Sequence, residues 1–128
     1  MIDAARLREL SSQQIHSYAL RCTCQVLQAA SWESVTDERW PAGLQHVGTL
    51  RPPDIDEPTF EEYHPHGTRY GSADAPIAVS WFPFNRSDVY VCGTCRSVFL
   101  RYTEYGGYYV NHRVRRVDPA LVVQVLQR

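Results

Sequence analysis

The stretch DVYVCGTCRSVFLRYTEYGGYYVNHRVRRV, residues 88–117, decides the fold. Asp88–Cys92 and Ser97–Thr103 are short runs rich in β-branched and aromatic residues, which favour strands. Gly106 and Gly107 follow these runs and predict a tight hairpin turn, because glycine readily adopts a positive φ. Tyr108–Val117 is then the returning strand. The stretch therefore predicts an antiparallel meander over residues 88–117.

The sequence after the meander predicts a closing helix over residues 118–128. Asp118 is a suitable N-cap, and Pro119 suits the first helical position. The apolar side chains that follow are spaced so that they share one face of such a helix. They are Leu121, Val122, Val125 and Leu126.

Residues 1–35 predict helical structure. Asp3–Leu10 has a short helical pattern, and from Gln13 to about Ala30 the apolar residues recur at spacings of three and four. A strand over Arg21–Gln28 is the alternative for the second segment. The choice matters because two cysteines lie in it.

Residues 44–81 predict a strand and a long loop. Gln45–Arg51 alternates loosely enough to be one strand, and Ile77–Trp81 is a second, shorter one. Between them, Pro52–Pro76 holds five prolines and two glycines, so we expect turns there. The whole chain is predicted to be a single α+β domain, in which a mainly antiparallel meander sheet packs with N-terminal helices and a C-terminal helix.

The composition is that of a folded domain. Of 128 residues 44% are hydrophobic and 21% charged, which argues against a disordered chain. All 13 basic residues are arginines, and with 14 acids they leave a net charge of −1, which disfavours the coating of nucleic acid. Residues 1–84 carry 11 acids and 6 arginines, whereas residues 85–128 carry 3 acids and 7 arginines. The charge is therefore uneven along the chain.

The start of the sequence predicts a cytoplasmic protein. Met1–Leu10 mixes charged and small apolar residues and lacks the pattern of a secretory signal. No apolar run approaches the roughly 18 residues of a membrane span. In the cytoplasm the four cysteines are expected to be reduced thiols or metal ligands.

The segment CGTC, residues 92–95, predicts one half of a zinc site. A tight turn between two strands directs both thiolates to one centre about 2.3 Å from each sulfur, as zinc requires. Together with Tyr90 and Phe99, this segment resembles the knuckle of zinc-ribbon and rubredoxin-like proteins, a resemblance that implies one structural zinc ion. Such knuckles usually carry glycine directly after the second cysteine, where this chain has Arg96.

Two further ligands are needed beside Cys92 and Cys95. His64 and His66, which flank Pro65 in the long loop, are one candidate pair. They remain candidates whatever structure the N-terminal segment adopts.

Cys22 and Cys24 are the alternative partners. On a helix they would face roughly 200° apart and could not both bind one ion. On a strand they would share a face, about 6.6 Å apart at Cα, and could chelate after some adjustment. The predicted helix therefore allows at most one of them at the metal.

Two other interpretations of the cysteines stay open. They could be plain reduced thiols, or Cys92 and Cys95 could form a redox pair, since Cys-Gly-x-Cys before a basic residue is also typical of thioredoxin-type sites. Ser97–Thr103 favours a strand where such sites have a helix. The redox interpretation therefore lacks its usual means of stabilising the thiolate.

The predicted function is a non-enzymatic binding or adaptor module with a protein partner. No nucleophile–base signature, phosphate-binding glycine loop or dinucleotide fingerprint is present in the sequence. Asp54, Asp56 and Glu57 of the acidic loop could meet a basic partner. Alternatively, the sheet could bind single-stranded nucleic acid, with tyrosines stacking on bases and arginines contacting phosphates. The residues of that surface are Arg96, Arg101, Tyr102, Tyr105, Tyr108, Arg113 and Arg115.

A longer run, Phe82–Val110, is similar to a stretch found in small proteobacterial proteins. The resemblance covers about a quarter of the chain and carries no assigned activity. It implies a compact bacterial cytosolic domain.

Overall fold

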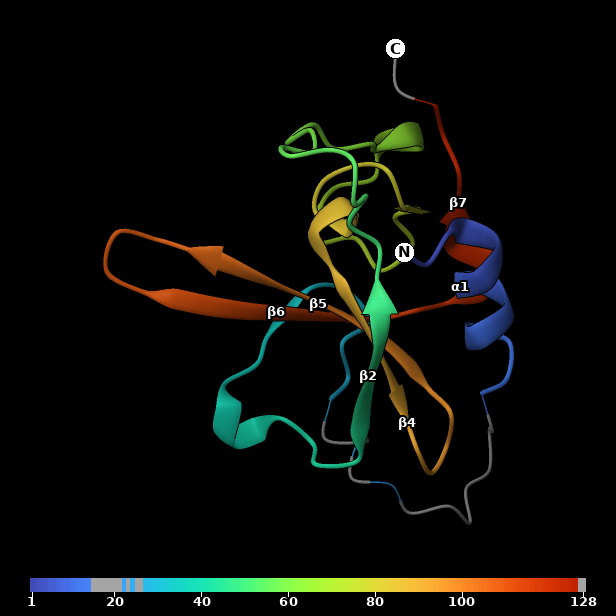
Figure 1. Ribbon diagram of the computed structural model, residues 1–128, viewed down its shortest axis with the longest axis vertical. Helices are drawn as coiled ribbons and strands as arrows, with labels where there is room; N and C mark the ends of the chain where they lie inside the picture. The colour runs from blue at the N-terminus through green and yellow to red at the C-terminus, as the bar shows by residue number, and fades with distance from the viewer. Residues whose placement is uncertain (15–21, 23, 25–26, 127–128) are drawn as a thin grey trace.

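The computed structural model describes residues 1–14, 22, 24 and 27–126. It is an α+β fold built on a five-stranded antiparallel sheet of order β1-β6-β5-β4-β2 (Figure 1). The strands of this sheet are β1 (Glu33–Ser34), β2 (Leu44–Thr49), β4 (Asp88–Cys92), β5 (Val98–Tyr105) and β6 (Val110–Arg116).

The meander predicted over residues 88–117 is confirmed as β4, β5 and β6. β5 pairs with β6 over its whole length, from Phe99↔Arg116 to Tyr105↔Val110. The far end of this hairpin, which we call the arm, extends well beyond the other strands (Figure 1). The connection runs through residues 106–109 and is closed by the Gly106 N–H donating to the Tyr109 carbonyl at 2.9 Å. A side chain at Gly106 would meet the ring of the exposed Tyr109, which would have to move aside.

Alternation along β5 gives the sheet two buried faces. Val98 and Leu100 lie in one core cluster with α1 (Ala4–Ser11) and Trp32. Phe99 points to the other face and is fully buried in a second cluster. Cys24, Cys92 and Cys95 belong to this cluster, and Cys22 packs against it. Side chains of a strand point alternately to opposite faces, so this run of consecutive apolar residues contributes to both cores.

The first predicted helix is confirmed as α1. The Asp3 side chain caps it by accepting from the Arg6 N–H at 2.8 Å, and Leu7 and Leu10 bury its inner face. Most of the second predicted helix, at 15–21, 23 and 25–26, lies outside the described residues. The end of that prediction, residues 27–30, is not helical, and Ala29 has a φ of 45°.

The predicted C-terminal helix is wrong. Asp118 does act as a cap, accepting from the Ala120 N–H at 3.0 Å, but only a 3-10 turn, Pro119–Leu121, follows. The chain then forms β7 (Val122–Val123), which pairs in parallel with β3 (Ile77–Ala78). β-branched valines favour a strand over a helix, and β3 offers them backbone partners that the sequence pattern does not reveal.

The remaining predictions for residues 44–81 hold in outline. The strand predicted over Gln45–Arg51 is β2, and the strand predicted over Ile77–Trp81 is shorter, as β3, and belongs to the small second sheet. The proline-rich segment between them holds a single 3-10 turn, Pro65–Gly67. No helix among the described residues has the length and apolar character needed to cross a membrane.

Candidate metal centre

The four cysteines meet at one place. The Sγ atoms of Cys22, Cys24, Cys92 and Cys95 all lie within 4.8 Å of one another. Three pairs are close, with Sγ–Sγ separations of 3.1 Å for Cys22 and Cys24, 2.9 Å for Cys22 and Cys92, and 3.3 Å for Cys24 and Cys95. Four sulfurs about 2.3 Å from a tetrahedral zinc ion lie roughly 3.8 Å apart. The cluster therefore has nearly the size of a tetrathiolate site.

The β4–β5 turn supplies two of these thiols as a knuckle. Cys92 ends β4, and its N–H and carbonyl are bonded to the Ser97 carbonyl at 2.9 Å and the Arg96 N–H at 3.0 Å. Arg96 has a φ of 65°, the left-handed conformation that favours glycine. Arg96 thus holds a backbone conformation that glycine would adopt at lower cost.

The N-terminal segment supplies the other two thiols. Cys22 and Cys24 both join the cluster, which corrects the expectation that at most one of them could reach a metal. Thiols 3.1 Å apart on residues two positions apart are incompatible with one α-helix, where the two side chains diverge. The alternative partners named from the sequence are therefore the ones that the fold brings to Cys92 and Cys95.

The histidines of the loop lie apart from this cluster. The His64 Nε2 atom is 2.9 Å from the Glu62 carboxylate, and His66 occupies the 3-10 turn with a φ of 58°. Among the described residues, the four cysteines are the one group of three or more His, Cys, Asp or Glu side chains close enough to share an ion.

The surroundings make the cluster a closed site. Cys24, Cys92 and Cys95 are buried, and Cys22 is partly buried. The core cluster around them is apolar, with Leu27, Val35, Leu44, Phe99 and Val114 buried and Trp40 and Tyr90 packed against it. Closed sites with four protein ligands are typical of structural zinc, whereas catalytic zinc keeps an open position.

The thiols differ in their affinity for protons. Burial raises the pKa of Cys24 far above its usual value, and burial together with the hydrogen bond to Cys92 also raises the pKa of Cys22. Burial acts in the same direction on Cys95, but hydrogen bonds with the side chain and backbone of Ser97 outweigh it and lower the pKa of Cys95 to about 6. Ser97, with its hydroxyl 3.1 Å from the Cys95 sulfur, is a neighbour of the candidate site that the sequence pattern does not single out.

The residues predicted to bind nucleic acid are largely engaged elsewhere. Tyr102 is 5% exposed, and its hydroxyl is bonded to that of Tyr70. Arg115 is 1% exposed and donates to the Ala75 carbonyl at 2.6 Å. Arg113 pairs with Glu104 at 2.9 Å.

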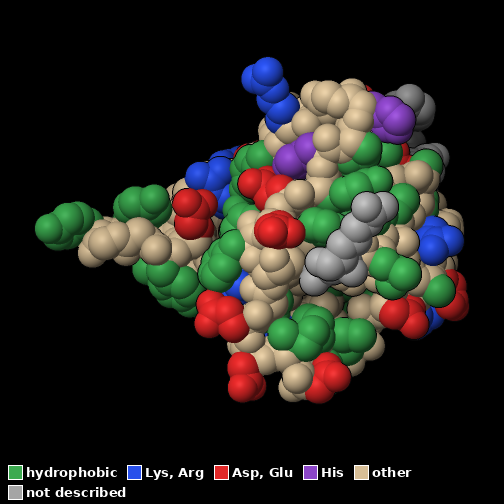
Figure 2. Space-filling view, turned by 90° about the horizontal axis from the view of Figure 1, so that it is seen from above, with side chains coloured by type: hydrophobic (Ala, Val, Ile, Leu, Met, Phe, Trp, Pro, Cys, Tyr) green, Lys and Arg blue, Asp and Glu red, His purple; other side chains and the backbone are tan. Residues whose placement is uncertain are grey.

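The rest of that predicted surface is spread over three regions. Arg101 pairs with Asp37 at 3.4 Å and lies over the Trp40 ring. Tyr105 and Tyr108 are exposed at the arm, whose apolar tip Figure 2 shows. Arg96 lies at the knuckle instead. The acidic residues Asp54, Asp56 and Glu57 are exposed in their loop.

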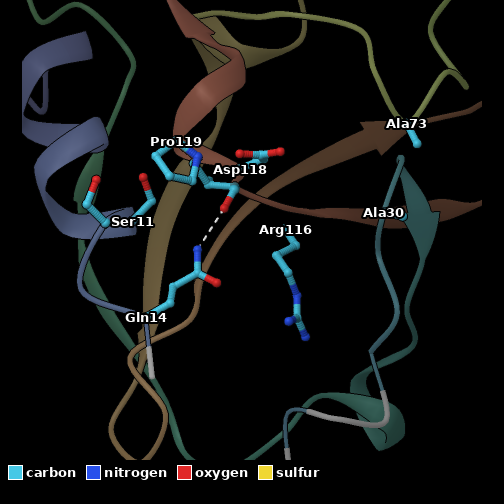
Figure 3. Close-up of a pocket in the computed structure, with 9 residues that line it drawn as sticks. Ser11, Gln14, Ala30, Ala73, Arg116, Asp118 and Pro119 are labelled. Atoms are coloured by element: carbon cyan, nitrogen blue, oxygen red, sulfur yellow. Dashed lines mark hydrogen bonds between the residues drawn. The ribbon is translucent and has the colours of Figure 1, made fainter. Parts of the chain in front are cut away.

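A separate cavity of about 510 Å³ lies between α1, the end of β6 and the loop at Ala73 (Figure 3). Its polar groups serve local structure. The Ser11 hydroxyl donates to the Leu7 carbonyl at 2.8 Å, and the Gln14 amide donates to the Val117 carbonyl at 2.9 Å. The Asp118 carboxylate, which also lines it, caps the Ala120 N–H, and the hydroxyls of Ser11 and Ser12 both donate to backbone carbonyls of α1.

Comparison of the chain with known proteins found no matching family model, no matching curated protein and no matching solved structure. Its function is therefore inferred from its own residues and geometry.

Proposed function

We propose that this chain is a small, non-enzymatic binding module of the bacterial cytoplasm, held together by one structural zinc ion and acting on a protein partner. The zinc ligands are Cys22, Cys24, Cys92 and Cys95. The observation that carries the proposal is the convergence of these four Sγ atoms within 4.8 Å in a mostly buried setting. A tetrahedral set of four sulfurs suits zinc or iron among the common metals.

The surroundings of the thiols favour a structural role over a redox one. A redox pair is normally activated by the N-terminus of a helix, but Cys95 is followed by β5. The cluster also joins four thiols, where a redox pair would need two. A cation neutralises several thiolates packed together in an apolar core, whereas their mutual repulsion opposes ionisation without one.

The ion would link distant parts of the chain. Cys22 and Cys92 are 70 residues apart in sequence, so an ion bound by both would tie the N-terminal thiols to the β4–β5 turn. Because ligand sets of this kind rarely exist in the unfolded chain, the binding energy of the metal becomes folding energy. A rigid, zinc-stabilised scaffold of this size suits recognition.

Zinc content of two matched double variants, measured by mass spectrometry of purified protein, tests the ligand set. We expect Cys22→Ser with Cys24→Ser to lose the zinc, because two of four ligands are removed. His64→Ala with His66→Ala should keep one zinc per chain, since these histidines lie outside the cluster. Loss of zinc from the histidine variant, or full retention in the cysteine variant, would refute the proposed site.

A further inference from the structure

β5 has an unpaired edge along the arm. The bond from the Val117 N–H to the Val98 carbonyl shows that even-numbered residues of β5 direct their backbone groups to β6, because hydrogen-bonded pairs alternate along an antiparallel ladder. The backbone N–H and C=O groups of odd-numbered residues of β5 therefore point toward β4, and the pairing of β4 with β5 ends at Asp88↔Arg101. Beyond that point the N–H and C=O groups of Thr103 and Tyr105 have no backbone partner in the described part of the chain.

A groove runs beside this edge. It encloses about 570 Å³ and is lined by side chains of β4, β5 and β6 and of the segments before β4. Aromatic rings form much of its surface, with Phe60 and Phe82 tilted against each other at 5.6 Å and Tyr90 and Tyr105 on the strands. Phe60 is 62% exposed and Tyr105 is 79% exposed. The groove thus offers apolar surface next to free backbone groups.

The charges of the groove leave a positive excess. Arg51 and Arg86 line it and donate to the backbone carbonyls of Asp56 at 2.9 Å and Pro58 at 2.5 Å. Neither has a carboxylate partner among residues 1–14, 22, 24 and 27–126. Arg86 also lies over the Phe60 ring at 3.9 Å, which holds its guanidinium in place.

The other charged groups of the groove are nearly balanced. Arg101 is paired with Asp37, and Glu104 is paired with Arg113. Asp88 is the remaining acid, and it lies 3.6 Å from His46. An occupant with negative charge would therefore find two guanidinium groups without a carboxylate.

We propose that this groove binds an extended acidic segment of a protein partner, which adds to β5 as an extra strand. Backbone groups of Thr103 and Tyr105 bind the main chain, Arg51 and Arg86 bind its carboxylates, and the rings pack on its alternate apolar side chains, as in β-augmentation. This inference rests on the proposed function as a binding module and names the class of partner. Nucleic acid fits less well, because it offers no complementary strand edge.

Fluorescence anisotropy with synthetic probes tests the groove on zinc-loaded protein. The probe is a fluorescein-labelled octapeptide that alternates glutamate with valine or tyrosine. Two analogues serve as controls, one with lysine at every glutamate and one with N-methyl groups on alternate backbone nitrogens. We expect saturable binding of the first, and at least tenfold weaker binding of both analogues, because one reverses the charge and the other blocks strand pairing.

Variants of the protein test the same contacts from the other side. Arg51→Gln with Arg86→Gln should weaken binding of the acidic probe at least tenfold, whereas Arg8→Gln with Arg69→Gln, which makes the same charge change outside the groove, should change it less than twofold. Thr103→Pro, which removes the outward N–H, should weaken binding, and Thr103→Val should not. If the proline variant unfolds, the N-methylated probe still reports on pairing.

Several results would overturn the inference. The acidic probe could fail to bind at high micromolar protein, or the lysine or N-methylated peptide could bind equally well. The double arginine variant could bind the acidic probe as tightly as wild type does. Self-association of the chain, or a single-stranded oligonucleotide at a lower concentration than the peptide needs, could displace the probe. Zinc content is measured on the same samples. Failure of peptide binding with one zinc per chain counts against the groove alone, and absence of zinc counts against the proposed function.

Discussion

At the scale of single residues, Arg96 shows how far a motif can depart from its usual residues. It follows the second cysteine of the knuckle and holds a φ of 65°, which glycine would adopt at lower cost. Its amide completes the turn by donating to the Cys92 carbonyl. The arginine at this position therefore leaves the turn between the two cysteines closed.

Substitution of Arg96 tests this conformation. We expect Arg96→Gly to leave the free energy of unfolding unchanged or raise it by up to about 1 kcal/mol, since glycine relieves the left-handed strain. Arg96→Val should lower it by roughly 1–2 kcal/mol, because a β-branched residue tolerates a positive φ poorly. Urea unfolding of the zinc-loaded proteins measures both. A glycine variant that is clearly less stable than wild type would contradict the assigned geometry.

The tyrosine pair Tyr70 and Tyr102 predicts a pH dependence. Burial raises the pKa of both hydroxyls above their ordinary value of 10.0. The unfolded chain therefore loses these protons first, and the free energy of unfolding should fall as the pH rises above about 10. Tyr102→Phe should reduce this slope, whereas Tyr108→Phe, at a fully exposed position, should not.

Urea unfolding at several pH values between about 9 and 11, on either side of the usual tyrosine pKa of about 10, measures that slope. Burial lowers the pKa of Arg115 to about 10, which acts in the opposite direction. This contribution is common to all three proteins and cancels in the comparison. Equal slopes for wild type and the Tyr102 variant would count against a buried, neutral tyrosine pair.

At the scale of elements, the meander could be predicted and the closing element could not. Local composition, rich in β-branched and aromatic residues, predicts the strands at Asp88–Cys92 and Val98–Tyr105. The two glycines predict the turn between β5 and β6. The C-terminal segment has a genuine cap at Asp118, but Val122 and Val123 become a strand because β3 lies beside them. That partner is distant in sequence, so periodicity alone could not identify it.

Metal removal should loosen one element and spare another. After chelation, we expect the Cys92 and Arg96 amides to exchange hydrogen at least tenfold faster, because their bonds close the knuckle around the metal. The amides of Glu104 and Asn111, which are paired in the arm, should keep their protection. Hydrogen exchange followed by NMR measures all four. Unchanged exchange at the knuckle would mean that the metal does not hold it.

At the scale of the whole molecule, half of the metal site followed from sequence and half required the fold. The spacing of Cys92 and Cys95 predicts a turn that carries two thiols, because the residues involved are neighbours in sequence. The other half does not follow from local pattern, because the apolar spacing around Cys22 and Cys24 predicts a helix that would separate their side chains. Their approach to the β4–β5 turn depends on contacts across 70 residues, which no local pattern encodes.

Loss of this link should destabilise the whole chain. Cross-linking residues that far apart is worth roughly 4 kcal/mol of unfolded-state entropy, so Cys22→Ser with Cys24→Ser should lower the free energy of unfolding by a comparable amount. Urea unfolding in the presence of zinc measures it, with His64→Ala and His66→Ala as the matched control. A variant as stable as wild type would show that the thiols do not join the two segments.

The zinc K-edge X-ray absorption spectrum of protein purified without added metal tests the proposed site most directly. A zinc ion held by the four cysteines should show a single shell of four sulfur atoms at about 2.3 Å. A mixed shell with imidazole nitrogen at about 2.0–2.1 Å, or a preparation without bound zinc, would contradict the tetrathiolate centre.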